Sequence, residues 1–94
     1  MHKTLSQILD EKYKSLPKDF VDELYSIMIN RIAKPAMNLK HRNIYLVIGL
    51  SIDCTNSREG LINVLYINSS SKINIFTREL REFHEKFMLL GNET

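Results

Sequence analysis

The sequence predicts one α+β domain with two N-terminal helices, a three-stranded antiparallel β-meander and a C-terminal helix. Apolar residues recur every three or four positions near both ends of the chain, which is the spacing of helices with one buried face. The middle of the chain is rich in β-branched and aromatic residues and is divided by short polar turns, which is typical of strands. The 94 residues form a single domain 1–94, which we divide into a helical pair (1–34), a connector (35–43) and the meander plus last helix (44–94).

The first helix is predicted to begin after Thr4 and to end near Ser15. Thr4 and Gln7 have the spacing of a capping box, in which each side chain satisfies one free backbone N–H group. Pro17 disfavours helical geometry at Leu16, so the helix stops before this pair.

The second helix is predicted to begin at Pro17 and to end near Lys34, because Pro35 cannot continue a helix. Its apolar residues cover about half of the helix circumference, which is wider than the stripe of a surface helix. Either several elements pack around this helix, or part of it contacts another chain.

Three strands are predicted over Ile44–Ile52, Leu61–Asn68 and Lys72–Phe76. Their short connections favour antiparallel pairing between neighbours. Gly49 indicates a bulge or a close approach within the first strand.

The last helix is predicted to begin after Thr77, whose hydroxyl can cap it, and to end at Gly91. Its apolar stripe consists of Leu80, Phe83, Phe87 and Leu90.

Several short motifs of the second half occur together in one family. They are Tyr45, Val47 and Gly49 at alternate positions, the turn from Thr55 to Gly60, then Val64 and Tyr66, and finally Arg78, Leu80, Glu82 and Phe83. With these motifs, residues 42–87 resemble a family of short bacterial and phage proteins known only as a domain of unknown function. Glu79 stands where that family usually has proline, and Val64 lies further from Glu59 than in the family. The resemblance implies a small curled antiparallel sheet and a phage or mobile-element setting, without an activity.

Charge and composition exclude several classes of protein. The formal net charge is +2, which is too small to indicate nucleic acid or an anionic membrane surface as the partner. The longest apolar run, Ile44–Ile52, is much shorter than the ~20 residues of a membrane helix, so we predict no membrane partner. One cysteine, Cys54, excludes an internal disulfide, and the first residues lack a signal-peptide pattern. We therefore predict a cytoplasmic protein, located in the host cytoplasm if a phage encodes it.

Catalytic and metal-binding patterns are weak. Cys54 could act as a nucleophile with His41 or His84 as its base, but no nucleophile signature surrounds it. The histidines occur singly in separate predicted elements, and no glycine-rich phosphate loop exists. We predict no catalytic residue, no metal and no cofactor, and therefore a protein that is not an enzyme.

Basic and aromatic side chains form the best candidate binding set. Cationic groups can hold a phosphate while an aromatic ring stacks on a base. The predicted binding residues are Arg42, Tyr45, Arg58, Tyr66, Arg78 and Arg81. Acidic residues are interleaved with them, which argues against an extended nucleic-acid surface.

Self-association is also predicted, most simply as a two-fold dimer. The second helix is broadly apolar, and a three-stranded sheet leaves two edges to be covered. The predicted interface residues are Tyr25, Ile29, Ile32, Leu65 and Ile67. In the alternative, the three helices cover the sheet completely and the monomer is sufficient.

From the small size, the lack of catalytic motifs and the resemblance, we predict a non-enzymatic binding module. It would be a phage or mobile-element accessory protein that binds and blocks a host defence protein. One alternative is an oligomer that sequesters a small nucleotide-type ligand, and another is a nucleic-acid-binding regulator.

Overall fold

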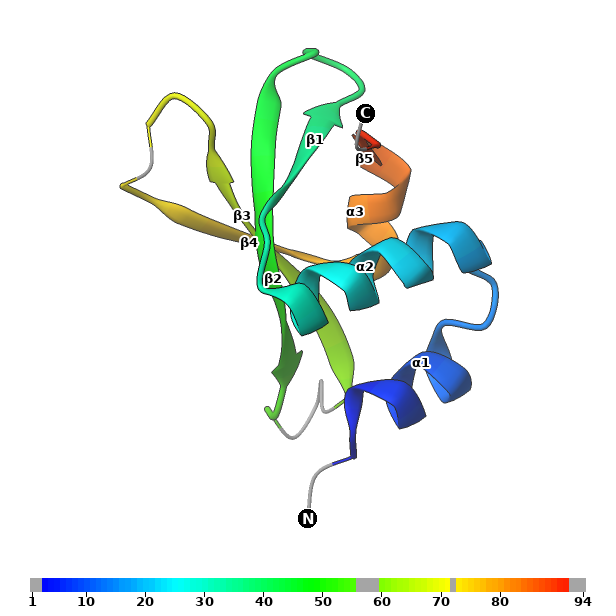
Figure 1. Ribbon diagram of the computed structural model, residues 1–94. Coiled ribbons are helices and arrows are strands. Elements are labelled where there is room, and N and C mark those ends of the chain that lie inside the picture. Colours follow the sequence, from blue (N-terminus) through cyan, green and yellow to red (C-terminus); the bar gives the residue numbers. More distant parts are fainter. Residues whose placement is uncertain (1–2, 56–59, 72, 92–94) are drawn as a thin grey trace.

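The computed structural model describes residues 3–55, 60–71 and 73–91. It is an antiparallel five-stranded sheet with the order β4-β3-β2-β1-β5, and the three helices pack on one of its faces (Figure 1). The α+β class is as predicted, but the three-stranded meander is wrong. Two short strands, β1 (Lys34–Asn38) and β5 (Phe87–Leu89), extend the sheet beyond β2.

Helix α1 (Leu5–Lys12) has the predicted capping box. The Gln7 amide N–H donates to Thr4 Oγ1 at 3.2 Å, and the Thr4 amide donates to Gln7 Oε1 at 2.8 Å. The helix ends at Lys12, earlier than predicted, because Tyr13 leaves helical geometry and its side chain is buried in the core.

Helix α2 (Lys18–Asn30) follows Pro17 and also ends earlier than predicted. Arg31 caps it with a left-handed backbone (φ 57°), which turns the chain into β1. The side of the helix that faces the sheet is buried through Leu24 and Ile27, whereas Ile29 is 73% exposed.

The connector predicted over 35–43 contains most of β1. Ala36 is fully buried, and the buried Lys34 forms an ion pair with Glu23 of α2. Pro35 lies near the start of the strand, where its missing N–H is tolerated, and its carbonyl accepts from the Leu90 amide at 2.9 Å. This strand pairs with β2 across a short turn and with β5, which is distant in sequence, and its own short local pattern did not predict it.

Strands β2 (Ile44–Asp53) and β3 (Leu61–Asn68) match the first two predicted strands closely. Their register shifts between Val47 and Gly49, which is the bulge that Gly49 indicated. Strand β4 (Ile75–Glu79) begins three residues later than the predicted third strand.

Helix α3 (Leu80–Lys86) begins and ends differently from the prediction. Thr77 does not cap it, because Thr77 lies in β4 opposite Leu65. Instead, the Glu79 side chain accepts from the Glu82 amide. At the other end, Phe87 is extended and pairs with Asn38, so hydrogen bonding to β1 replaces the helical turn predicted up to Gly91.

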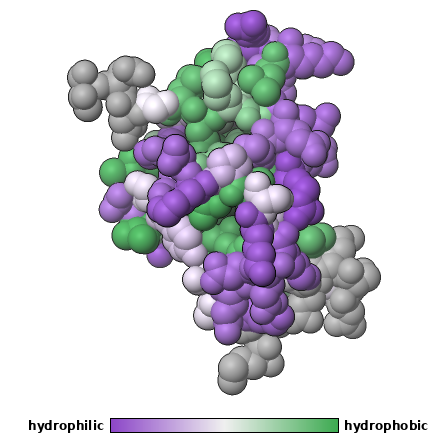
Figure 2. All heavy atoms as spheres, turned by 90° about the vertical axis from the view of Figure 1, so that its right-hand side faces the viewer, coloured by the Kyte–Doolittle hydropathy of each residue, from purple (hydrophilic) through white to green (hydrophobic). Residues whose placement is uncertain are grey.

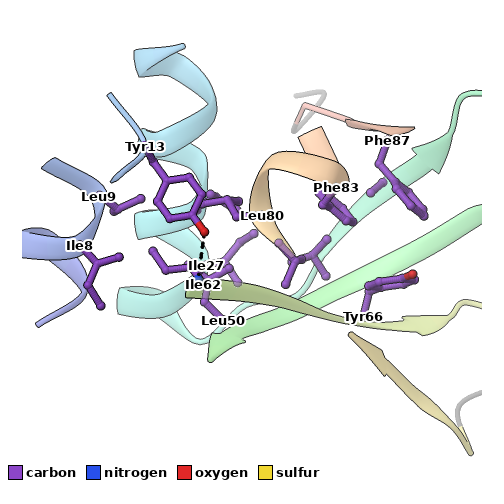
Figure 3. Close-up of a cluster of buried hydrophobic side chains, with 14 residues drawn as sticks. Ile8, Leu9, Tyr13, Ile27, Leu50, Ile62, Tyr66, Leu80, Phe83 and Phe87 are labelled. Carbon is purple, nitrogen blue, oxygen red and sulfur yellow. Dashed lines mark hydrogen bonds between the residues drawn. The ribbon is translucent and has the colours of Figure 1, made fainter. Parts of the chain in front are cut away.

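The core lies between the helices and the sheet, and Tyr13 crosses it with a buried hydroxyl (Figure 3). The hydroxyl accepts from the Ile62 amide at 3.1 Å and donates to Glu79 Oε2 at 2.5 Å. Burial and the bond to Glu79 raise the pKa of Tyr13 to about 12. Burial opposes ionisation of Glu79, but the bonds from Tyr13 and from backbone N–H groups outweigh it and lower the pKa of this carboxyl.

These pKa shifts predict an alkaline loss of stability. The pKa of Tyr13 is 10.0 in the unfolded chain and about 12 in the folded protein, so unfolding releases a proton between these values. The stabilisation is complete below pH 10.0 and is lost as the pH rises toward about 12. We expect the melting temperature of the wild type to fall more steeply over this range than that of Tyr13→Phe. Parallel pH dependences for both proteins would contradict this coupling.

Candidate functional site

An aromatic cluster joins the strands to α3 and β5. The Tyr66 ring lies 5.4 Å from Tyr45, 5.2 Å from Phe87 and 5.7 Å from Phe83. The rings of Phe83 and Phe87 are stacked, with centroids 4.5 Å apart. Figure 3 shows Tyr66, Phe83 and Phe87 pointing toward one another from β3, α3 and β5. The cluster forms a packed aromatic surface against which a charged side chain can lie.

Arg78 of β4 lies against this surface. Its Nε–H donates to the Tyr66 hydroxyl at 3.3 Å, and its Nη1 donates to Glu82 Oε1 at 2.6 Å. The guanidinium carbon lies 5.7 Å from the centroid of the Phe87 ring. The bond to Tyr66, with a smaller effect from Glu82, raises the pKa of Arg78 despite partial burial. Arg78 is therefore a permanently charged and oriented group.

A depression of about 410 Å³ opens beside Arg78, and we call it the Arg78 pocket. It is lined by Asn38, Leu39, Lys40, His41, Arg78, Glu85 and Lys86. The lining includes three basic side chains, those of Lys40, Arg78 and Lys86, and one acidic side chain, that of Glu85. They come from the β1–β2 turn, from β4 and from the end of α3, so only the folded chain collects this positive charge.

The β1–β2 turn that carries Lys40 and His41 is held by hydrogen bonds. Asn38 Oδ1 accepts from the Lys40 amide at 3.0 Å and from the His41 amide at 2.9 Å. Arg42 adopts a left-handed backbone (φ 63°), and the Leu39 amide donates to the Lys86 carbonyl at 2.9 Å. These hydrogen bonds attach the turn to α3, and the turn forms one wall of the Arg78 pocket.

The structure brings together three of the six predicted binding residues, Tyr45, Tyr66 and Arg78. Arg42 is exposed in the β1–β2 turn. Arg81 has a different role, because its Nη2 donates to the Lys12 carbonyl at 2.6 Å and its guanidinium stacks over Tyr13. It fastens α1 to α3 and does not line the Arg78 pocket. Arg58 lies outside the described residues.

The predicted interface residues fall into separate places. Tyr25 packs against the core, whereas Ile29 and Ile32 are exposed at the end of α2 and just beyond it. Leu65 and Ile67 lie on the face of the sheet that the helices do not cover. No single surface therefore contains all five.

Sequence reasoning missed Lys86 and Phe76 as neighbours of Arg78. The sequence predicts Lys86 within a longer helix, but Lys86 is the last residue of α3 and lies beside the β1–β2 turn. Phe76 lies in β4, two residues before Arg78 on the same face, and its ring is 5.7 Å from that of Tyr66. The alternation of Phe76 with Arg78 was the one available signal, and it required the correct strand boundary.

The residues considered for catalysis do not converge. His41 precedes β2 and Cys54 follows it, so the length of a ten-residue strand, roughly 30 Å, separates them. The His84 ring packs on Phe20 at 4.6 Å. Among residues 3–55, 60–71 and 73–91, no three His, Cys, Asp or Glu side chains gather in a way that could hold a metal ion.

A second depression lies on the helical side and is mainly apolar. It measures about 400 Å³ and is lined by Asp19, Phe20, Glu23, Leu39, His84, Phe87, Met88 and Leu89. Figure 2 shows hydrophobic atoms gathered toward the upper end of this side, at the level of β5 in Figure 1. Its two carboxylates make it unsuited to an anion, in contrast to the Arg78 pocket.

No family model, curated protein or solved structure matches this chain. The resemblance of residues 42–87 to a phage-associated family therefore stays a prediction. In the described part of the chain, no helix combines the length and the apolar composition that crossing a bilayer requires.

Proposed function

We propose that this protein is a non-enzymatic binding module that holds a small phosphate-bearing ligand of the nucleotide type in the Arg78 pocket. The observation that carries the proposal is the convergence of Lys40, Arg78 and Lys86 around one depression. Its volume of about 410 Å³ is within the range of small-molecule sites. We place this activity in the cytoplasm, as the sequence predicts.

A phosphate group is the natural partner for these side chains. An arginine offers a planar fork of donors, and lysines add mobile point charges. Two donors of Arg78 are used by Tyr66 and Glu82, which orient the guanidinium and leave further N–H groups for a ligand. The charges of Lys40, Arg78 and Lys86 outnumber the single carboxylate of Glu85 in the pocket.

Phe76 favours a ligand that also has a planar ring. It is 41% exposed although its ring packs on Tyr66, and it lies on the same face of β4 as Arg78. Two residues along a strand span about 7 Å. A base stacked on Phe76 would therefore place an attached phosphate within reach of Arg78. An extended nucleic acid is less well suited, because the cationic patch is confined to one pocket.

Calorimetric titration with ATP, AMP, a cyclic mononucleotide, inorganic phosphate and uncharged adenosine tests this function. We expect the nucleotides to bind more tightly than phosphate or adenosine, with an affinity that falls as salt is raised. Arg78→Gln should weaken binding roughly 10- to 100-fold, because a hydrogen-bonded charge pair is removed.

The matched control is Arg31→Gln, which makes the same change at an exposed arginine at the end of α2. It should leave the affinity unchanged. Lys40→Gln combined with Lys86→Gln alters the pocket without touching the aromatic cluster and should also weaken binding. If the folded wild type gives no heat of binding with any of these ligands, the proposed function is wrong.

A further inference from the structure

One face of the sheet is left without helices. All three helices lie on the opposite side, and no helix or strand of the described residues covers this one (Figure 1). Along β3, Ile62, Val64 and Tyr66 are buried beneath the helices, so Leu65 and Ile67 point to the other side. A sheet with one bare face is common, but a bare face is normally polar.

The bare face is apolar across several strands. Cross-strand partners share a face, and the register pairs Leu46 with Ile67, Ile67 with Ile75, and Met37 with Ile44. We call this set, together with Leu65, the open sheet face. Ile75 is 62% exposed and Ile44 is 37% exposed, so the apolar atoms are accessible. Exposed apolar surface of this extent marks an interaction site in a folded protein.

Charge on the open sheet face is restricted to its ends. Among the described residues, its polar positions are Ser51, Asn63 and Thr77, which gather at the end of the sheet away from Ile44 and Ile67. Asp53 ends β2 at the same side, and Glu79, opposite Asn63, ends β4 with its carboxylate bound to the Tyr13 hydroxyl. A two-fold axis places such a patch against itself, so a neutral apolar patch meets no like-charge repulsion. The apolar part of the open sheet face offers no opposite charge to a strongly charged partner.

The size of the face also fits a second copy. Strand spacing and rise give a five-stranded sheet with a ten-residue central strand a face on the order of 600 Å². A standard stable interface buries about 800 Å² on each partner, which exceeds this flat area, so a dimer would use the whole face together with the side chains at its margin. Two such faces can stack about 10 Å apart as the layers of a sandwich, with both aliphatic sets buried.

We infer that two copies of this chain associate through the open sheet face into a two-fold β-sandwich dimer. The inference is independent of the Arg78 pocket, because Arg78 and Phe76 point toward the helical side of β4. Ile29 and Ile32 contribute nothing to this interface, since they belong to the end of α2 and the segment after it.

Sedimentation of the full chain over a concentration series tests the dimer. We expect the wild type to have twice the monomer mass of 11.0 kDa. Ile75→Lys places a charge on the edge strand β4, against Ile67 in the apolar part of the interface, and should raise the dissociation constant roughly 100-fold. Because Ile75 is already exposed in the monomer, this variant should fold, which circular dichroism checks.

The matched control is Ile29→Lys, which makes the same change at a residue of α2 that is 73% exposed. It should leave the dimer intact. A second variant, Ile67→Lys, repeats the test on β3. A monomeric wild type, or a dimer that Ile29→Lys dissociates and Ile75→Lys does not, would overturn the inference. Nucleotide titration of Ile75→Lys separates this result from the pocket, which should still bind.

Discussion

Phe83→Ala is expected to lower the free energy of unfolding by about 3–5 kcal/mol, which is the cost of removing a buried phenylalanine and leaving a cavity. Phe83 is completely buried, stacks on Phe87 at 4.5 Å and lies 5.7 Å from the Tyr66 ring. Its loss would remove the contact that connects α3 to β5 and β3. For a domain of this size, each kcal/mol shifts the melting temperature by about 4–8 °C. Calorimetric melting at neutral pH measures the change.

The matched control is Phe76→Ala, the same substitution at a ring that is 41% exposed. It should cost well under half as much, because much of the ring already contacts water. If the two variants melt at the same temperature, the aromatic cluster does not contribute to stability as its burial indicates. Phe76→Ala should also weaken nucleotide binding, which would separate the binding role of this ring from the structural role of Phe83.

Tyr13→Phe is expected to lower the free energy of unfolding by about 2–3 kcal/mol, although only one oxygen is removed. The hydroxyl accepts from the Ile62 amide and donates to Glu79, and both contacts are lost. The Ile62 N–H then stays buried without its partner, which costs more than the net value of an ordinary hydrogen bond. Urea unfolding at neutral pH measures the difference.

Tyr25→Phe serves as the control, because Tyr25 is only partly buried and its hydroxyl is not part of the Tyr13–Glu79 network. It should change stability by less than about 0.5 kcal/mol. In the Tyr13→Phe background, Glu79→Gln should recover part of the lost free energy of unfolding. Leaving a neutral amide without the Tyr13 donor costs less than leaving a carboxylate without it. Equal stabilities for wild type and Tyr13→Phe would show that the hydroxyl network is energetically neutral.

Local signals were sufficient for much of this fold. The capping box of Thr4 and Gln7 stabilises the start of α1 through neighbouring residues, so the pattern predicted it correctly. The β-branched run of β2 and the bulge at Gly49 also follow from local preference. The alternation of Tyr45 and Val47 placed Tyr45 on the same face as the buried Val47, where its ring meets that of Tyr66.

The secondary-structure predictions were wrong where a residue suits a helix locally but pairs with another strand in the folded protein. Phe87 continues the helical spacing of Leu80 and Phe83, yet it pairs with Asn38 in the sheet. Thr77 is a good helix cap, yet it pairs with Leu65. In each case hydrogen bonds to another strand compete with a helical turn. For Phe87 the partner strand β1 is remote in sequence, and for Thr77 it is the preceding strand β3.

By itself, the sequence determined the α+β class, the two main strands, the starts of both N-terminal helices and the presence of arginines and tyrosines suited to a phosphate ligand. Only the tertiary structure decided that Arg78 lines one pocket together with Lys40 and Lys86, whereas Arg81 donates to the Lys12 carbonyl of α1. It also decided that all three helices share one face and leave the other bare. The physical reason is that residue spacing governs short-range hydrogen bonds, whereas a pocket or an open face depends on which distant strands pair.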